Sequence, residues 1–225
     1  RTGAISAFFF DIDQDGQMDI ITRSSVLDRN GRVKFKYPVF FFDSPSVADL
    51  DRDGDYEIIG VTYTGSTTNL YVIDLNGILL GWPKVVGEST PSYGKLSVIA
   101  NMNDDKDLEI VYVDRYGFLS ILDRRGNYLV NMQIDNYIEI PATPAVADLD
   151  GDGSPDLVLT NNSDSTISVL KNNGNGTYAQ KVDYRTGSYP NAVVAADLDG
   201  DGDLDLAVAN ENSNTVSILK NNGDG

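Results

Sequence analysis

Residues 148–156, DLDGDGSPD, and residues 197–205, DLDGDGDLD, decide the fold, because this nine-residue acidic loop recurs along the chain. The pattern is Asp-x-Asp-x-Asp-Gly-x-x-Asp/Glu, and further copies start at Asp11 and Asp49. An altered copy starts at Asn101, so successive starts are 38, 52, 47 and 49 residues apart. Periods of roughly 20 to 50 residues are typical of solenoids, propellers and arrays. The sequence therefore predicts one repeat-built domain.

The composition limits the classes of protein that the chain can be. Asp and Glu number 34 against 17 Lys and Arg, for a formal net charge of −17. No basic stripe is visible, so nucleic-acid binding is not expected. The absence of Cys and His removes disulfides, thiolate metal sites and the commonest general base. No apolar run approaches the roughly 18 residues of a transmembrane helix.

The chain starts at Arg1, without Met and without a signal-peptide pattern. We therefore expect a processed or excised segment, which can form part of a larger chain or surface assembly.

Each repeat is predicted to contain antiparallel strands joined by hairpins. An apolar stretch precedes each loop, a β-rich stretch follows it, and a third stretch ends in an Asn-Gly or Arg-Gly turn before a looser fourth strand. Four such strands per repeat are typical of a propeller blade, and no helical period persists. The expected first strands are Ala4–Phe10, Pro45–Ala48, Leu96–Ala100, Ala142–Ala147 and Ala192–Ala196.

The predicted fold is an all-β propeller of five four-stranded blades, which can belong to a larger ring of about seven blades. The blades cover approximately residues 1–38, 39–90, 91–137, 138–186 and 187–225. The first blade is short, and the fifth stops at NNGDG, where the fourth continues with TYAQKVDY. The fifth blade is thus expected to lack its outer strand.

The second position of each loop is apolar, although its neighbours at positions 1 and 3 carry polar oxygens. We expect these side chains to point into the core between blades while the carboxylates turn toward an ion. They are Ile12, Leu50, Met102, Leu149 and Leu198.

The chemistry of the loop indicates a hard cation. Side-chain oxygens at positions 1, 3, 5 and 9 and a backbone carbonyl at position 7 can surround one ion, and Gly at position 6 permits the sharp turn. Three or four crowded carboxylates suit Ca²⁺ better than Mg²⁺. An EF-hand is excluded, because position 9 closes the loop and the flanking segments are strands.

Residues 148–178 and 197–225 resemble the FG-GAP/VCBS repeats of integrin-α-type propellers, in which this loop joins the two innermost strands of a blade and holds Ca²⁺. The resemblance implies four or five calcium ions. Matched position by position, it implies as metal ligands Asp11, Asp13, Asp15, Gln17 and Asp19; Asp49, Asp51, Asp53, Asp55 and Glu57; Asp148, Asp150, Asp152, Ser154 and Asp156; and Asp197, Asp199, Asp201, Asp203 and Asp205.

The third loop departs from the pattern. Asn replaces Asp at positions 1 and 3, and Lys106 replaces Gly at position 6. Its side-chain positions carry a charge of −2 instead of −4, so a metal-bound and a metal-free loop both stay open. Its candidate ligands are Asn101, Asn103, Asp105, Asp107 and Glu109.

The function expected from these features is that of a secreted or cell-surface calcium-binding module for adhesion, protein interaction or structure, with a protein or glycan as partner. Calcium of the weak extracellular affinity class would stabilise each inner loop. One alternative is a calcium-stabilised lectin, in which aromatic side chains stack on sugars. The aromatic candidates are Trp82, Tyr93, Tyr116, Tyr137 and Tyr189.

A further alternative is the propeller portion of a polysaccharide lyase. Without His, the base would have to be Lys, Tyr or Arg, and no constellation singles out Tyr63, Lys95 or Tyr112. The prediction is that the chain is not an enzyme.

Overall fold

The computed structural model describes residues 7–42, 44–88, 97–103, 105–114, 116–134, 144–223 and 225. Within these residues the chain forms twenty β-strands and no helix, which confirms the all-β prediction. The described residues accordingly include no helix with the length and apolar character needed to cross a membrane. The N-terminal ends of three expected strands, at residues 4–6, 96 and 142–143, lie outside the described part.

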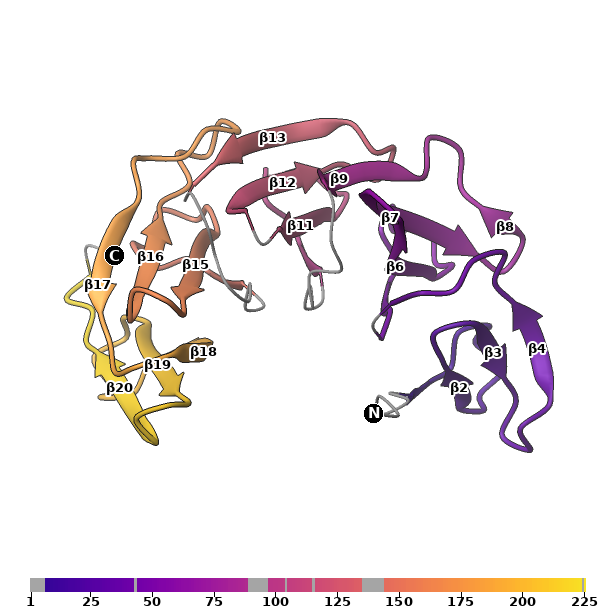
Figure 1. Cartoon of the computed structure of the whole chain (residues 1–225), viewed down its shortest axis with the longest axis horizontal. Helices are drawn as coiled ribbons and strands as arrows, with labels where there is room; N and C mark the ends of the chain where they lie inside the picture. Colours follow the sequence, from indigo (N-terminus) through magenta and orange to yellow (C-terminus); the bar gives the residue numbers. More distant parts are fainter. Residues whose placement is uncertain are drawn as a thin grey trace. The chain divides into compact units, whose positions relative to one another are not determined.

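The strands form five antiparallel sheets, each traced as an up-and-down meander in chain order (Figure 1). We call the sheets blades 1 to 5. Blade 1 contains β1 (Phe8–Phe10), β2 (Asp19–Ile21), β3 (Ser25–Leu27) and β4 (Val33–Lys36). Blade 2 contains β5 (Ser46–Ala48), β6 (Glu57–Thr64), β7 (Thr67–Asp74), β8 (Gly77–Ile78) and β9 (Lys84–Glu88).

The last three blades follow the same order. Blade 3 contains β10 (Val98–Ala100), β11 (Glu109–Val113), β12 (Phe118–Leu122) and β13 (Tyr128–Gln133). Blade 4 contains β14 (Ala145–Ala147), β15 (Asp156–Asn161), β16 (Thr166–Leu170) and β17 (Val182–Arg185). Blade 5 contains β18 (Pro190–Ala196), β19 (Asp205–Asn210) and β20 (Thr215–Leu219).

Two blades depart from four strands. Blade 5 has three strands within the described residues, as the sequence predicts from its missing TYAQKVDY equivalent. Blade 2 has five, because β8 and β9 both pair with β7 where one outer strand was expected. The segment between them contains Gly81, with a φ of 98°, and Pro83, which has no N–H to donate. These two residues interrupt the pairing.

The described chain divides into two compact units, one of Arg1–Pro91 with Asp123–Asn127 and one of Ser92–Leu122 with Tyr128–Gly225. The core of the first unit contains Ile12, Ile21, Val26, Phe41, Ile58 and Ile73. The second unit holds two apolar clusters, one that includes Met102 and one that includes Leu149. The central strands β11 and β15 are buried along their whole length, in keeping with their Ile-, Val- and Leu-rich sequences.

The apolar second position of each acidic loop behaves as predicted in four blades. Ile12, Leu50, Met102 and Leu149 are each less than 5% exposed. Leu198 of blade 5 is 49% exposed, and Val216 and Ile218 on β20 are 64% and 51% exposed. Their counterparts 49 residues earlier, Ile167 and Val169 of blade 4, pack against blade 5 and are buried.

An asparagine after the third strand joins neighbouring blades in the second unit. The side-chain amide of Asn172 donates to the carbonyl of Met102 at 3.0 Å and to that of Pro155 at 3.1 Å. Its equivalent Asn221 donates to the carbonyls of Leu149 and Leu204, at 2.6 and 3.3 Å. Each amide therefore links its own acidic loop to position 2 of the loop in the preceding blade.

Replacement of Asn172 by Ala should lower the stability of the second unit. Asn172 is 2% exposed, and its loss leaves two carbonyls without their donor, which costs about 2 kcal/mol. A loss of that size lowers Tm by roughly 4–8 °C in a chain of this length. Thermal melting followed by circular dichroism measures the shift. Asn222→Ala, at an exposed position, is the matched control and should leave Tm unchanged.

Candidate metal centres

Each acidic loop connects the first and second strands of a blade, and four of the loops share one backbone conformation. Position 4 has a positive φ in each, at Gln14, Arg52, Gly151 and Gly200. The glycines at position 6 have φ values of 83° to 100°. This left-handed region strongly favours glycine, so the sharp turn depends on the Gly of the motif. The residues at position 6 are Gly16, Gly54, Gly153 and Gly202.

The aspartate at position 1 folds the loop around its own carboxylate. In the first loop the two oxygens of Asp11 accept the N–H groups of Asp15 and Gly16, at 3.1 and 2.9 Å. In the second loop Asp49 accepts those of Asp53 and Gly54, both at 3.1 Å. Backbone donors therefore hold this carboxylate in place.

The carboxylate at position 5 has an equally regular role. It accepts the N–H of position 7 in every loop, over distances of 2.7 to 3.0 Å. The predicted backbone ligands at position 7 therefore belong to residues whose amides are already fixed. The residue pairs are Asp15 and Gln17, Asp53 and Asp55, Asp105 and Asp107, Asp152 and Ser154, and Asp201 and Asp203.

Three carboxylates converge in each of the four complete loops. In every group one oxygen from each residue lies within 4.8 Å of the others, so each group can hold a metal ion. Positions 1, 3 and 5 form the group in three loops, whereas the fourth loop uses positions 1, 3 and 9. The groups are Asp11, Asp13 and Asp15; Asp49, Asp51 and Asp53; Asp148, Asp150 and Asp156; and Asp197, Asp199 and Asp201.

The acid at position 9 is buried and also bonds to the backbone. Glu57, Glu109, Asp156 and Asp205 each accept the N–H of position 2 of their own loop, at 2.7 to 3.2 Å. The second oxygens of Asp156 and Asp205 accept the N–H groups of Asn172 and Asn221, each at 2.8 Å. This acid therefore staples its loop to the strands as well as offering a ligand.

Burial shifts the ionisation of these acids. Burial raises the pKa of Glu57 to about 7, the charges of Asp51, Asp53 and Asp49 add to the shift, and the Leu50 N–H opposes it. Burial likewise raises the pKa of Asp156, against the N–H groups of Asn172 and Leu149. Both carboxylates are thus costly to keep ionised without a nearby positive charge.

Unpartnered buried oxygens support a cation in the second and fourth loops. Oδ1 of Asp51, Asp148 and Asp150 are buried, and no hydrogen bond reaches them within the described residues. Buried carboxylate oxygens are normally paired or coordinate a metal. The donor sets of these two loops therefore fit a hard cation.

In the third loop, side-chain amides make hydrogen bonds at positions 1 and 3. The side-chain amide of Asn101 donates to the carbonyl of Asp105, and the N–H of Asp105 donates to Oδ1 of Asn103 at 3.1 Å. No group of three converging acids occurs in this loop among the residues described, which leave out Asp104. The lower charge of this loop in the sequence thus corresponds to fewer converging carboxylates in the structure.

Basic side chains lie beside the four complete loops, and the motif itself did not indicate them. Arg124 contacts Asp51 at 2.9 Å, Lys171 contacts Asp150 at 3.6 Å and Lys220 contacts Asp199 at 2.7 Å. Lys34 approaches three carboxylates of the first loop. The repeated LKNN of blades 4 and 5 marks two of these lysines and the interblade asparagines, whereas no repeat signal marks Lys34.

The aromatic residues do not form a stacking platform among the described residues. Trp82 is 7% exposed and donates its indole N–H to the carbonyl of Arg124 at 3.0 Å, so its prediction as a sugar-stacking residue is wrong. Tyr116 and Tyr189 are half-buried, and Tyr93 and Tyr137 lie outside the described residues. Of the residues considered as a base, Tyr112 is 1% exposed and Lys95 is not described.

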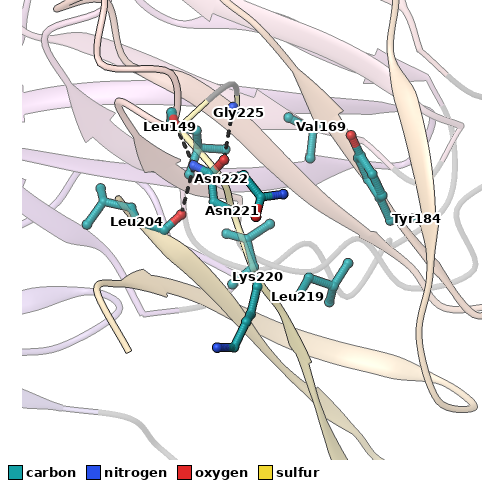
Figure 2. A pocket seen from close by; sticks show the side chains of 10 residues that line it. Leu149, Val169, Tyr184, Leu204, Leu219, Lys220, Asn221, Asn222 and Gly225 are labelled. Carbon is teal, nitrogen blue, oxygen red and sulfur yellow. Dashed lines mark hydrogen bonds between the residues drawn. The ribbon is translucent and has the colours of Figure 1, made fainter. Parts of the chain in front are cut away.

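A pocket of about 280 Å³ lies next to the interblade asparagine of blade 5 (Figure 2). Leu149, Val169 and Tyr184 of blade 4 line it together with Leu219 and Asn221 of blade 5. Figure 2 shows Asn221 bonded to Leu149 and Leu204 at this pocket.

Comparison with known proteins gives one sequence match and several structural ones. Residues 148–208 match the model of the FG-GAP-like repeat, as the sequence predicts. No curated protein matches the chain. The three solved structures described next are each less than 25% identical to the chain, so they show the fold alone.

Three of these structures come from different functional classes. The Vibrio cholerae biofilm matrix protein Bap1 has a TM-score of 0.64 and 13% identity, over 96% of this chain and 62% of its own. A lectin of Agrocybe aegerita that recognises non-reducing terminal N-acetylglucosamine has a TM-score of 0.55 and 22% identity. The match covers 98% of this chain and 64% of the lectin. Rhamnogalacturonan lyase PL11 of Bacillus licheniformis has a TM-score of 0.57 and 18% identity. The match covers 80% of this chain and 41% of the lyase.

The chain thus spans less than two thirds of the length of each of these three structures. Residues 148–208 match an FG-GAP-like repeat, within an all-β fold that the chain shares with these structures.

Proposed function

We propose that the chain is a non-catalytic, calcium-stabilised binding module of a secreted or cell-surface protein. The observation that carries the proposal is the convergence of three carboxylates in each complete acidic loop. Within the described part of the chain, no hydrogen bond reaches the buried Oδ1 atoms of Asp51, Asp148 and Asp150. Oxygen-only donor sets of this charge suit Ca²⁺. The second, fourth and fifth loops are its proposed sites, and the third stays open.

The proposed role of the ion is to neutralise the loop and lock the hairpin that the loop connects. In blade 4, Asp148 and Asp150 would hold it together with Asp152, Asp156 and the Ser154 carbonyl. The same loop supplies the Leu149 carbonyl to Asn221 of the next blade. Stabilisation of the loop therefore supports the contact between blades 4 and 5 as well.

We propose an extracellular location because of the calcium affinity expected for such loops. Loops of this kind in extracellular modules bind calcium at roughly 0.1–1 mM, so they are filled outside cells and largely empty in the cytosol. A structural role in such a setting suits a module that presents a fixed surface to a protein or glycan. Bap1, a biofilm matrix protein, has the same fold, which supports this reading without assigning the chain its activity.

Calcium should raise the thermal stability of the chain. An ion that binds only the folded state contributes about 2.7 kcal/mol per site at one hundred times Kd. At roughly 2–4 °C per kcal/mol, even one filled site raises Tm by about 5–10 °C. Melting in EGTA and with rising CaCl₂ measures the effect, and an identical Tm in both conditions would contradict the proposal.

A double variant tests the fourth loop directly. Asp148→Asn with Asp150→Asn should lower the number of bound calcium ions by one, because both residues lie in one carboxylate group. Native mass spectrometry counts the ions. Asp164→Asn, an exposed acid in the turn between β15 and β16, is the control and should leave the count unchanged.

The lectin remains the second candidate, supported by the shared fold with a GlcNAc-binding lectin. The buried position of Trp82 weighs against it. On a glycan array, the chain as a protein-binding or structural module should bind no sugar, with or without EGTA. Calcium-dependent binding to one class of glycan would favour the lectin instead.

The fold shared with rhamnogalacturonan lyases does not imply their chemistry. We expect no cleavage when the chain is incubated with rhamnogalacturonan or another uronate polymer in the presence of calcium. The absorbance of unsaturated products measures cleavage, and an active lyase provides the positive control. Formation of such products by the isolated chain would refute the non-catalytic assignment.

A further inference from the structure

We propose that the first acidic loop is closed by the ammonium group of Lys34 and takes no calcium ion. The inference rests on the proposed function for the other loops, since it singles out one loop of a calcium-binding set. The residues present in this loop do not fit a calcium ion in the way that those of the second and fourth loops do.

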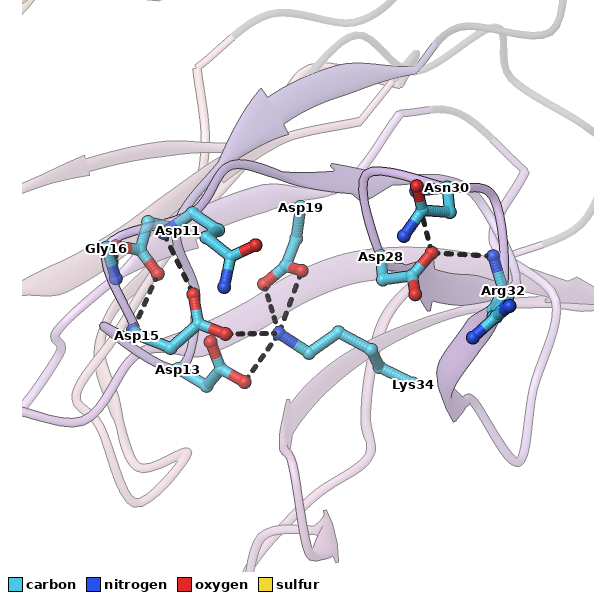
Figure 3. Close-up of polar contacts among 10 residues, drawn as sticks. Asp11, Asp13, Asp15, Gly16, Asp19, Asp28, Asn30, Arg32 and Lys34 are labelled. Atoms are coloured by element: carbon cyan, nitrogen blue, oxygen red, sulfur yellow. Dashed lines mark hydrogen bonds and ion pairs between the residues drawn. The ribbon is translucent and has the colours of Figure 1, made fainter.

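The ammonium group of Lys34 lies against the carboxylates of the first loop, with 26% of the side chain still exposed (Figure 3). Its Nζ lies 2.5 Å from Oδ2 of Asp13, 2.9 Å from Oδ1 of Asp19 and 3.7 Å from Oδ2 of Asp15. A second contact to Asp19, at Oδ2, measures 3.1 Å. Positions 3, 5 and 9 of the loop thus share one ammonium group.

The acid at position 9 distinguishes the first loop. Lys34 takes both oxygens of Asp19, which is 1% exposed. In the second, fourth and fifth loops the acid at position 9 accepts backbone N–H groups, and the measured ion pairs involve position 3. Calcium in the first loop would have to displace the lysine from the innermost carboxylate.

The local sequence explains how Lys34 reaches the loop. In blade 1 the pairing of Leu27 with Val33 and of Val26 with Phe35 leaves Lys34 as the extra residue of a β-bulge. Blade 3 has the same bulge, and there Leu129 is the extra residue. Bulges re-aim a side chain, so one lysine at this position is enough to place a charge in the loop.

The charges also favour the lysine. The ammonium group of Lys34 already pairs with Asp13 and Asp19 inside the loop. The four acids of the loop then carry −3 together with Lys34 instead of −4. A calcium ion would lose part of its attraction and would have to break the three contacts.

The test counts bound calcium ions and measures the thermal melting of Lys34→Leu, which places the leucine of the blade 3 bulge in blade 1. Lys34→Leu should bind one calcium ion more than the wild type by native mass spectrometry, and Asp13→Asn should bind as many as the wild type. In EGTA, Lys34→Leu should melt about 5 °C lower, because Asp13, Asp15 and Asp19 lose their counter-charge, and calcium should reverse the loss. Lys36→Leu, on the same strand and exposed, is the control.

The outcomes separate the inference from the proposed function. Loss of one ion in Asp13→Asn, or no gain in Lys34→Leu, overturns the role of Lys34 while calcium binding elsewhere stands. If the wild type binds no calcium, the proposed function is overturned. The Tm of Lys34→Leu in EGTA still tests whether Lys34 closes the first loop. An unchanged Tm of Lys34→Leu in EGTA would refute the closure by lysine.

Discussion

Repulsion between carboxylates is the constraint on which the rest of the structure depends. Each complete acidic loop brings three carboxylates together within 4.8 Å, close to a buried acid that opens the next strand. Carboxylates held this close repel one another and oppose folding unless positive charge or hydrogen-bond donors compensate them. Backbone amides supply part of that compensation in every loop, and Lys34 supplies more in the first. The proposed calcium ions would complete it elsewhere.

The backbone hydrogen bonds that compensate these charges also connect the loops to the strands. Because the acid at position 9 accepts the N–H of position 2, the second, third, fourth and fifth loops are each fastened to the strand that follows. The same hydrogen bond fixes the orientation of the apolar residue at position 2. In the second, third and fourth loops that side chain is also buried, so the polar and apolar parts of the motif are fixed together there.

The repeat could be predicted from sequence because its signals are local. Strand, loop and turn recur in fixed order, and the three-stranded fifth blade follows from the missing TYAQKVDY equivalent. The partners of the loops could not be predicted, since they come from distant strands. The position of Lys34 depends on a β-bulge that no sequence pattern predicts. The role of Asn172 becomes clear only from its hydrogen bond to the Met102 carbonyl. The burial of Trp82 could not be predicted either, because its partner, the Arg124 carbonyl, lies 42 residues away in the sequence.

The interblade asparagines make one continuous hydrogen-bonded path through blades 3, 4 and 5. It runs from the Met102 carbonyl through Asn172 to Asp156, and from the Leu149 N–H and carbonyl through Asn221 to Asp205. Because neighbouring acidic loops share these hydrogen-bonded residues, we expect a change in one loop to alter the free energy of the next. Thermodynamic reciprocity would then require the same effect in return. The amide side chains of Asn172 and Asn221 would carry this coupling between repeats.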